Sequence, residues 1–117
     1  MNRKINTIII GLGRIGIGYD EHTPNVTLTH YKAIQKHKNF KLIGCIEVNK
    51  INRDKFIKKY KVPCYENLSK IKNKINPELA IIASPTNTHY RIIKEILKNH
   101  KTISSILCEK PFGNKYQ

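Results

Sequence analysis

The chain has 117 residues and a formal net charge of +14, from 22 basic and 8 acidic residues. This length allows one hydrophobic core but is short for two ordinary domains, so we expect residues 1–117 to form a single domain. The charge by itself would suit nucleic acid or an anionic membrane surface. However, the basic residues form no dense block and Trp is absent, so we expect no specific nucleic-acid partner.

The three cysteines, Cys45, Cys64 and Cys108, are an odd number and form no CxxC pair. Two of them lie inside apolar runs, where a reduced, buried cysteine behaves as a small hydrophobe, so we expect no metal site. The sequence has no apolar segment typical of a signal peptide and none near the ~20 residues that span a bilayer. These features favour a reducing cytoplasm and no membrane partner.

Five short apolar runs predict strands, at residues 5–10, 40–46, 62–65, 79–83 and 103–108. Their nearly continuous apolar character is typical of strands covered on both faces. Apolar residues at helical spacing lie between them, at 51–60, 68–75 and 89–97, and Asn87 and Thr88 are candidate caps for the last helix. The order predicts a three-layer α/β fold: a doubly wound, Rossmann-like parallel sheet with strand order 3-2-1-4-5, incomplete at the C-terminus.

A glycine-rich turn directly follows the first predicted strand and consists of Gly11, Leu12, Gly13, Arg14, Ile15 and Gly16. Gly11 permits a tight turn, Gly13 lets the backbone approach a pyrophosphate, and Gly16 lets the next helix lie close to the sheet. Free N–H groups at the helix start attract phosphates. The strand before the turn and the crossover after it favour dinucleotide binding over a tight turn without a ligand.

Glu47 ends the second predicted strand, where a carboxylate can accept hydrogen bonds from the adenosine ribose hydroxyls. This carboxylate would repel a 2′-phosphate, so we expect NAD as the cofactor. Nearby Lys50 and Arg53 could hold such a phosphate, which leaves NADP as the alternative. The alternative interpretation of Glu47 is a solvated acid at a strand end.

Two polar segments follow the fourth and fifth predicted strands at the carboxyl edge of the sheet, where ligands collect. They contain Ser84, Pro85, Thr86, Asn87, Thr88 and His89, and then Glu109, Lys110 and Pro111. His89 could equally contact a ligand or pack at the start of its helix. Lys110 could hydrogen-bond a substrate hydroxyl and stabilise negative charge as hydride leaves, although a solvated cation is the alternative in a chain with 18 lysines.

Together these motifs resemble the N-terminal domain of the glucose–fructose oxidoreductase, inositol dehydrogenase and rhizopine-catabolism family (Gfo/Idh/MocA). The resemblance covers essentially the whole chain. It implies NAD(P) contacts at residues 11–16, Glu47, residues 84–89 and residues 109–111, with Lys110 as the active-site lysine. It also implies oxidation or reduction of a hydroxyl or carbonyl on a sugar, inositol or related small molecule.

The chain departs from the family pattern in three places. Glu47 stands where the family more often has Asp, and residues 19–25 form an insertion rich in turn formers. The family's second domain, which supplies the substrate pocket, is missing, so we expect cofactor binding with little turnover. We also expect an exposed apolar sheet edge or domain interface, which favours self-association into homo-oligomers. The alternative function is a non-catalytic nucleotide-binding module, regulatory or structural, including a methyl-donor site.

Overall fold

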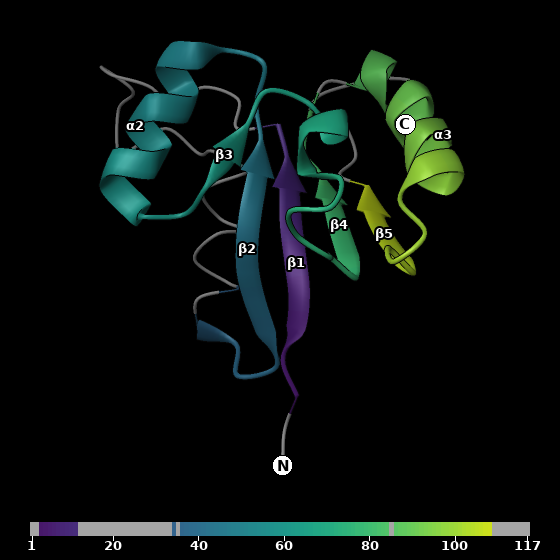
Figure 1. Cartoon of the computed structure of the whole chain (residues 1–117), viewed down its shortest axis with the longest axis horizontal. Coiled ribbons are helices and arrows are strands. Elements are labelled where there is room, and N and C mark those ends of the chain that lie inside the picture. Colours follow the sequence, from purple (N-terminus) through teal and green to yellow (C-terminus); the bar gives the residue numbers. More distant parts are fainter. Residues whose placement is uncertain (1–2, 12–33, 35, 85, 109–117) are drawn as a thin grey trace, which may run out of the picture.

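The computed structural model describes residues 3–11, 34, 36–84 and 86–108 (Figure 1). Five strands form one parallel sheet in the order β3-β2-β1-β4-β5, which confirms the predicted strand order. The strands are β1 (Ile5–Ile10), β2 (Phe40–Ile46), β3 (Cys64–Tyr65), β4 (Leu79–Ile82) and β5 (Ser105–Cys108). The helices whose full extent lies within the described residues are α2 (Lys50–Tyr60) and α3 (His89–Asn99), and two short 3₁₀ turns are η1 (Leu68–Ile71) and η2 (Thr86–Thr88).

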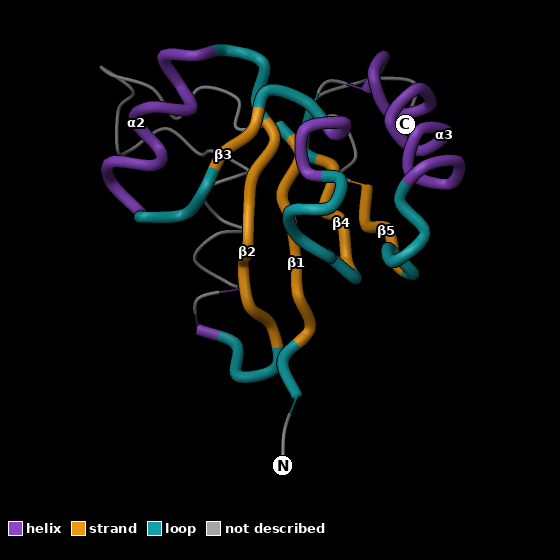
Figure 2. Tube along the Cα trace, in the orientation of Figure 1, coloured by secondary structure: helices purple, strands orange, loops and turns teal. Residues whose placement is uncertain are grey.

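The sheet separates two apolar clusters, because neighbouring side chains along a strand point to opposite faces. Ile8 and Ile10 of β1 pack in one cluster with η1 and α3, which contributes Ile92 and Ile96. Ile9 packs in the other cluster with Phe56 of α2. Figure 2 shows the strands between the two helices, and the two clusters confirm a three-layer α/β fold.

The third strand and the segment after it differ from the sequence prediction. β3 has only two residues, since Pro63 has no N–H to donate to the ladder, although its carbonyl accepts the Cys45 N–H at 2.9 Å. The predicted helix over residues 68–75 is wrong. It is a single 3₁₀ turn, because Lys72 has extended dihedrals and Asn73 has a left-handed φ of 68°.

β5 is more exposed than the prediction of a strand covered on both faces. Among the described residues it pairs only with β4, through partners such as Ile82 and Cys108. Leu107 is 49% exposed, and Cys108 is exposed although its apolar run suggested burial. An exposed apolar edge is therefore present, while self-association through it stays a prediction.

The starts of the two helices have different caps. The Asn49 side chain caps α2 by accepting the Asn52 N–H at 3.0 Å. Thr88 occupies the N-cap position of α3 as predicted, but its hydroxyl hydrogen-bonds Ser84 Oγ at 2.7 Å and makes no capping bond. No helix within the described residues is long and apolar enough to cross a membrane.

Candidate dinucleotide site

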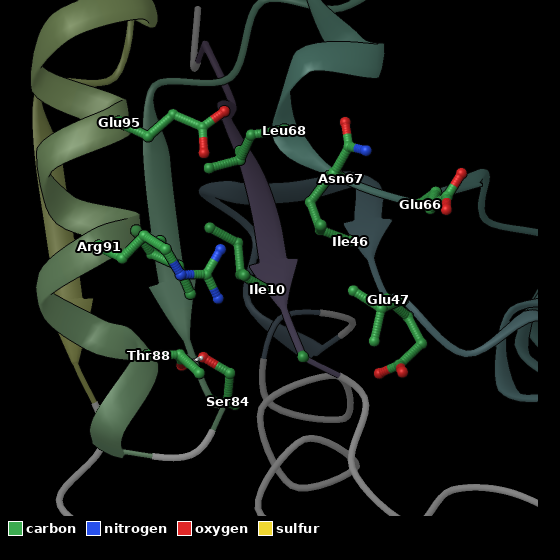
Figure 3. A pocket seen from close by; sticks show the side chains of 14 residues that line it. Ile10, Ile46, Glu47, Glu66, Asn67, Leu68, Ser84, Thr88, Arg91 and Glu95 are labelled. Atoms are coloured by element: carbon green, nitrogen blue, oxygen red, sulfur yellow. Dashed lines mark hydrogen bonds between the residues drawn. The ribbon is translucent and has the colours of Figure 1, made fainter.

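A cavity of about 420 Å³ opens at the carboxyl ends of β1, β2 and β4 (Figure 3). The ends of these strands and the residues that follow them supply one part of its lining: Ile10, Gly11, Ile46, Glu47, Val48, Ala83 and Ser84. The segment after β3, the turn η2 and the helix α3 supply the rest: Glu66, Asn67, Leu68, Thr88, Arg91, Ile92 and Glu95. This is the edge at which doubly wound sheets bind ligands, so the topology and the cavity indicate the same site.

Gly11 lies where the end of β1 meets the end of β4. Its φ is 94°, a conformation that residues with a side chain rarely adopt, and its N–H donates to the Ile46 carbonyl at 2.7 Å. A Cβ at Gly11 would lie 2.7 Å from the Ser84 backbone nitrogen. The structure therefore requires glycine at the first position of the turn. The other positions of the glycine motif, Leu12, Gly13, Arg14, Ile15 and Gly16, lie outside the described residues.

Glu47 is buried at the end of β2, with 9% of its surface exposed. Its N–H donates to the Tyr65 carbonyl at 2.9 Å, and its Oε2 accepts the Asn49 N–H at 2.9 Å. Both the strand and the following turn thus fix the carboxylate beside the cavity. The interpretation of Glu47 as a solvated acid at a strand end is wrong.

The two cations near Glu47 have other partners. Arg53 Nη1 donates to the carbonyl oxygens of Glu47 at 2.9 Å and Val48 at 3.0 Å. Lys50 Nζ forms an ion pair with Asp54 on the exposed side of α2, at 2.7 Å. In this arrangement Arg53 stabilises the turn after β2, and neither cation lines the cavity.

The charged side chains of the cavity are mostly acidic. Glu47, Glu66 and Glu95 line it, and Arg91 of α3 is the basic residue among the lining side chains. In Figure 3 the Arg91 guanidinium extends from α3 toward the middle of the cavity, while Glu47 lies across the cavity beside the end of β2. Apolar side chains, including Ile46 and Leu68, lie between these charged groups (Figure 3).

The segment after β4 forms a hydrogen-bonded turn. Ser84 and Thr88 line the cavity and share the 2.7 Å hydrogen bond between their hydroxyls. The His89 ring hydrogen-bonds through Nε2 with the Ser84 carbonyl at 2.8 Å, so His89 holds the turn together at the start of α3. Asn87 is exposed within η2, and neither it nor His89 is among the described lining residues. Thr86 belongs to η2, and Pro85 lies outside the described residues.

The segment with the candidate catalytic residue, Glu109, Lys110 and Pro111, also lies outside the described residues. β5 leads directly into it, and Cys108 is the register partner of Ile82 at the end of β4. The last described residue, Cys108, therefore lies at the carboxyl end of β5, beside the end of β4. Within the described part of the chain, no group of three or more His, Cys, Asp or Glu residues could hold a metal ion.

Several lining residues were not among the sequence candidates. Glu66, Asn67 and Leu68 follow β3 at the carboxyl edge, so the rule that selected Glu47 and Ser84 could have found them. Arg91 and Glu95 precede the buried Ile92 and Ile96 of α3. Nothing in the sequence distinguishes this pair from other charged residues at the border of a helix face.

The sequence matches a known protein family and a characterised relative. The family model GFO_IDH_MocA, described as an oxidoreductase family with an NAD-binding Rossmann fold, matches residues 5–117. Glucose-6-phosphate 3-dehydrogenase of Bacillus subtilis strain 168 is 30% identical over 102 residues, which cover 87% of this chain and 26% of that protein.

Solved structures of similar fold include dehydrogenases with bound cofactor and a second ligand. Scyllo-inositol dehydrogenase from Lactobacillus casei, with NAD(H) and scyllo-inositol, superposes with a TM-score of 0.71 at 23% identity, over 95% of this chain and 29% of that one. The WlbA dehydrogenase from Bordetella pertussis, with NADH and UDP-GlcNAcA, gives 0.73 at 21% identity, over 93% and 30%. This chain spans between 26% and 30% of the length of these three relatives.

Proposed function

This chain belongs to the Gfo/Idh/MocA oxidoreductase family, and we propose that its cavity receives the adenosine half of a nicotinamide dinucleotide. The family match confirms the Rossmann fold and the NAD-binding class that the sequence predicted. One observation carries the specific proposal. Glu47 is buried at the end of β2, lines the cavity, and lies next to the backbone turn at Gly11.

The lining offers a separate environment for each part of adenosine diphosphate. Apolar side chains of Ile46, Leu68 and Ile92 suit the faces of an adenine ring. The Glu47 carboxylate would accept hydrogen bonds from the ribose hydroxyls, with its geometry fixed by the Asn49 N–H. The turn that begins at Gly11 would then lie beside the pyrophosphate. This order, adenine to ribose to phosphate, follows the cavity from α3 and η1 toward the end of β1.

The charges near Glu47 favour NAD over NADP. A 2′-phosphate on the ribose would meet the Glu47 carboxylate, with Glu66 also lining the cavity. Arg53 Nη1 donates to two backbone carbonyls, and Arg53 is not among the described lining residues. Both features support NAD as the preferred cofactor, while NADP remains the weaker alternative.

For the whole protein we propose hydride transfer between nicotinamide and a hydroxyl or carbonyl of a sugar-like or inositol-like substrate. Support comes from the B. subtilis dehydrogenase of glucose 6-phosphate and from the solved structures with scyllo-inositol or a nucleotide sugar. Lys110 would hydrogen-bond the reacting oxygen and stabilise its developing charge. Residues 1–117 would act as the cofactor domain, in the cytoplasm, with little turnover because the substrate must be positioned by other residues.

Calorimetric titration of the chain with NAD and NADP tests this proposal. We expect saturable NAD binding that is tighter than NADP binding. Glu47→Gln should weaken NAD binding about tenfold, the loss expected when hydrogen bonds to a charged acceptor become neutral. Asp54→Asn, which changes an acid on the exposed side of α2, should bind NAD like the unmodified chain. Absence of binding by either dinucleotide at millimolar concentration, together with binding of S-adenosylmethionine, would instead support the non-catalytic module.

A further inference from the structure

Cys45 and Cys64 lie directly opposite each other in the neighbouring parallel strands β2 and β3. Adjacent strands are about 4.8 Å apart, which is inside the Cα–Cα range of about 4.4–6.8 Å for disulfide-bonded cysteines. The chain's third cysteine, Cys108, belongs to β5 at the opposite edge of the sheet. The topology therefore selects one cysteine pair out of three.

The two side chains also share one face of the sheet. Cys45 is buried in the cluster that contains Phe56 and Val62, and the partly buried Cys64 packs against the same cluster. The Cys64 thiol donates a hydrogen bond to the Val62 carbonyl at 3.8 Å. A hydrogen bond with Cys64 and burial raise the pKa of the Cys45 thiol.

The difference in exposure assigns a role to each thiol. Cys64, which is partly exposed, can meet a small oxidant from solvent, whereas Cys45 is buried beside it. Reaction of a thiol with an oxidant depends on access and on the thiolate fraction. Cys64 is thus the residue that reacts first, and Cys45 is the residue placed to resolve the product.

We propose that Cys45 and Cys64 form a redox modification site that a peroxide converts into an intrachain disulfide. The Cys64 sulfur attacks one peroxide oxygen, the O–O bond breaks, and Cys64 sulfenic acid and water form. The Cys45 sulfur then attacks the Cys64 sulfur, the S–O bond breaks, and the Cys45 proton leaves with the hydroxide as a second water. Two thiols are oxidised and one peroxide is reduced to two waters.

The site is connected to the cavity through the same strand pair. Glu47 follows Cys45 by two residues and Glu66 follows Cys64 by two, and both glutamates line the cavity. The Glu47 N–H donates to the Tyr65 carbonyl at 2.9 Å, directly beyond the cysteine pair. A disulfide sets the Cβ atoms about 3.8 Å apart and would tie the two-residue edge strand β3 to β2, so we expect bond formation to affect this end of the cavity.

Peroxide treatment of a Cys108→Ser chain tests the chemistry without any ligand, so its outcome is independent of the proposed function. We expect the intact mass to fall by two hydrogen atoms, both thiols to become resistant to alkylation, and dithiothreitol to reverse both changes. Peptide mapping should join Cys45 to Cys64 within one chain. Cys64→Ser in the same background should show no such mass loss, and this variant changes the partly exposed member of the pair and leaves the buried Cys45 intact.

Three results would overturn the proposal. The first is that both thiols of the Cys108→Ser chain stay alkylatable after peroxide treatment. The second is that Cys64 advances to sulfinic acid while Cys45 stays reduced, and the third is that the unmodified chain forms its disulfide with Cys108. For the connection to the cavity, we expect the oxidised chain to exchange the Glu47 amide hydrogen at a different rate, and an unchanged rate would contradict it.

Discussion

Gly11 and Ser84 approach so closely that a Cβ on Gly11 would lie 2.7 Å from the Ser84 backbone nitrogen and 2.8 Å from its Cα. The contact joins the ends of β1 and β4, which are adjacent strands of the sheet. Both residues line the cavity. The first glycine of the motif is therefore required by packing between strands as well as by its φ of 94°.

Gly11→Ala should destabilise the fold and disturb the cavity. The left-handed conformation of an alanine costs about 1–3 kcal/mol, and the Ser84 backbone must shift in addition. Gly44→Ala is the matched control in β2, where the new Cβ would lie 3.0 Å from the tip of the flexible Ile75 side chain. Urea unfolding should show a larger loss of unfolding free energy for Gly11→Ala than for Gly44→Ala. The reverse order would contradict the packing argument.

Arg53→Gln should weaken NAD and NADP binding by a similar factor. In the structure Arg53 holds the turn after β2 through the carbonyls of Glu47 and Val48, so its loss affects the position of the Glu47 carboxylate. Lys50→Gln serves as the control, because Lys50 pairs with Asp54 at the exposed surface. Calorimetry with both dinucleotides distinguishes this role from phosphate recognition. A selective loss of NADP binding in Arg53→Gln would show that Arg53 binds the 2′-phosphate.

The Arg3–Glu78 ion pair should make the free energy of unfolding decrease as the pH becomes acidic. Both Arg3 Nη atoms donate to the Glu78 carboxylate, at 2.8 and 2.6 Å, and the Asn6 N–H donates to Glu78 Oε1 at 3.2 Å. The hydrogen bond from Arg3, followed by that from Asn6, lowers the pKa of Glu78 below its ordinary value of 4.5. A lowered carboxyl pKa stabilises the fold above the ordinary pKa, and this contribution disappears as pH falls through the folded-state value.

Urea unfolding of Glu78→Gln measures this contribution. The unmodified chain should be more stable than the variant at neutral pH, and the difference should shrink below the ordinary glutamate pKa of 4.5. Added salt should also reduce it, because the Arg3 side chain is largely exposed. A difference that stays constant with pH would mean that Glu78 acts through packing and not through charge.

His100 should give the folding stability a second dependence on pH, at values closer to neutrality. It is buried at the end of α3, and its Nε2 has no hydrogen-bond partner in the part of the chain that the structure describes. Burial lowers the pKa of His100 from its ordinary 6.5, with a smaller opposing effect from Glu95 and a lowering effect from Lys72. The unfolded chain therefore binds a proton first as pH falls below 6.5, and the fold loses stability until the folded-state pKa is reached.

His100→Gln, which does not titrate, should remove this part of the pH dependence. Thermal unfolding between about pH 7.5 and about pH 5, on either side of the ordinary histidine pKa, provides the comparison. The unmodified chain should lose more stability over this interval than the variant. Equal pH profiles would indicate that His100 is already solvated in the folded protein.

Much of the fold could be predicted because each strand is an apolar run that ends at a polar or glycine residue. The pattern at Leu68, Ile71 and Ile75 misled the prediction, since a 3₁₀ turn followed by the left-handed Asn73 also brings such residues to the core. The exposure of Cys108 was also predicted wrongly from its apolar run. Its apolar run predicted burial, but exposure at a sheet edge depends on which strands lie beside it.

The site was predictable where its residues end strands, and less so where they belong to a helix. Glu47 and Ser84 follow strands at the edge where ligands bind, and both line the cavity. Arg91 and Glu95 line it because the packing of Ile92 and Ile96 sets the rotation of α3. The role of Arg53 was not predictable either. Its position in the sequence allows phosphate binding as well as the hydrogen bonds to the Glu47 and Val48 carbonyls that the structure shows.

Backbone amide shifts in a ¹⁵N NMR titration of the chain with NAD test the central claim most directly. The account predicts that the amides of Gly11, Glu47 and Ser84 shift together and saturate with one dissociation constant, because all three residues line one cavity. The amide chemical shifts of β5 residues such as Ile106, which lie outside the described lining, should change less on NAD addition. Saturable NAD binding that shifts other amides and leaves these three unchanged would contradict the account.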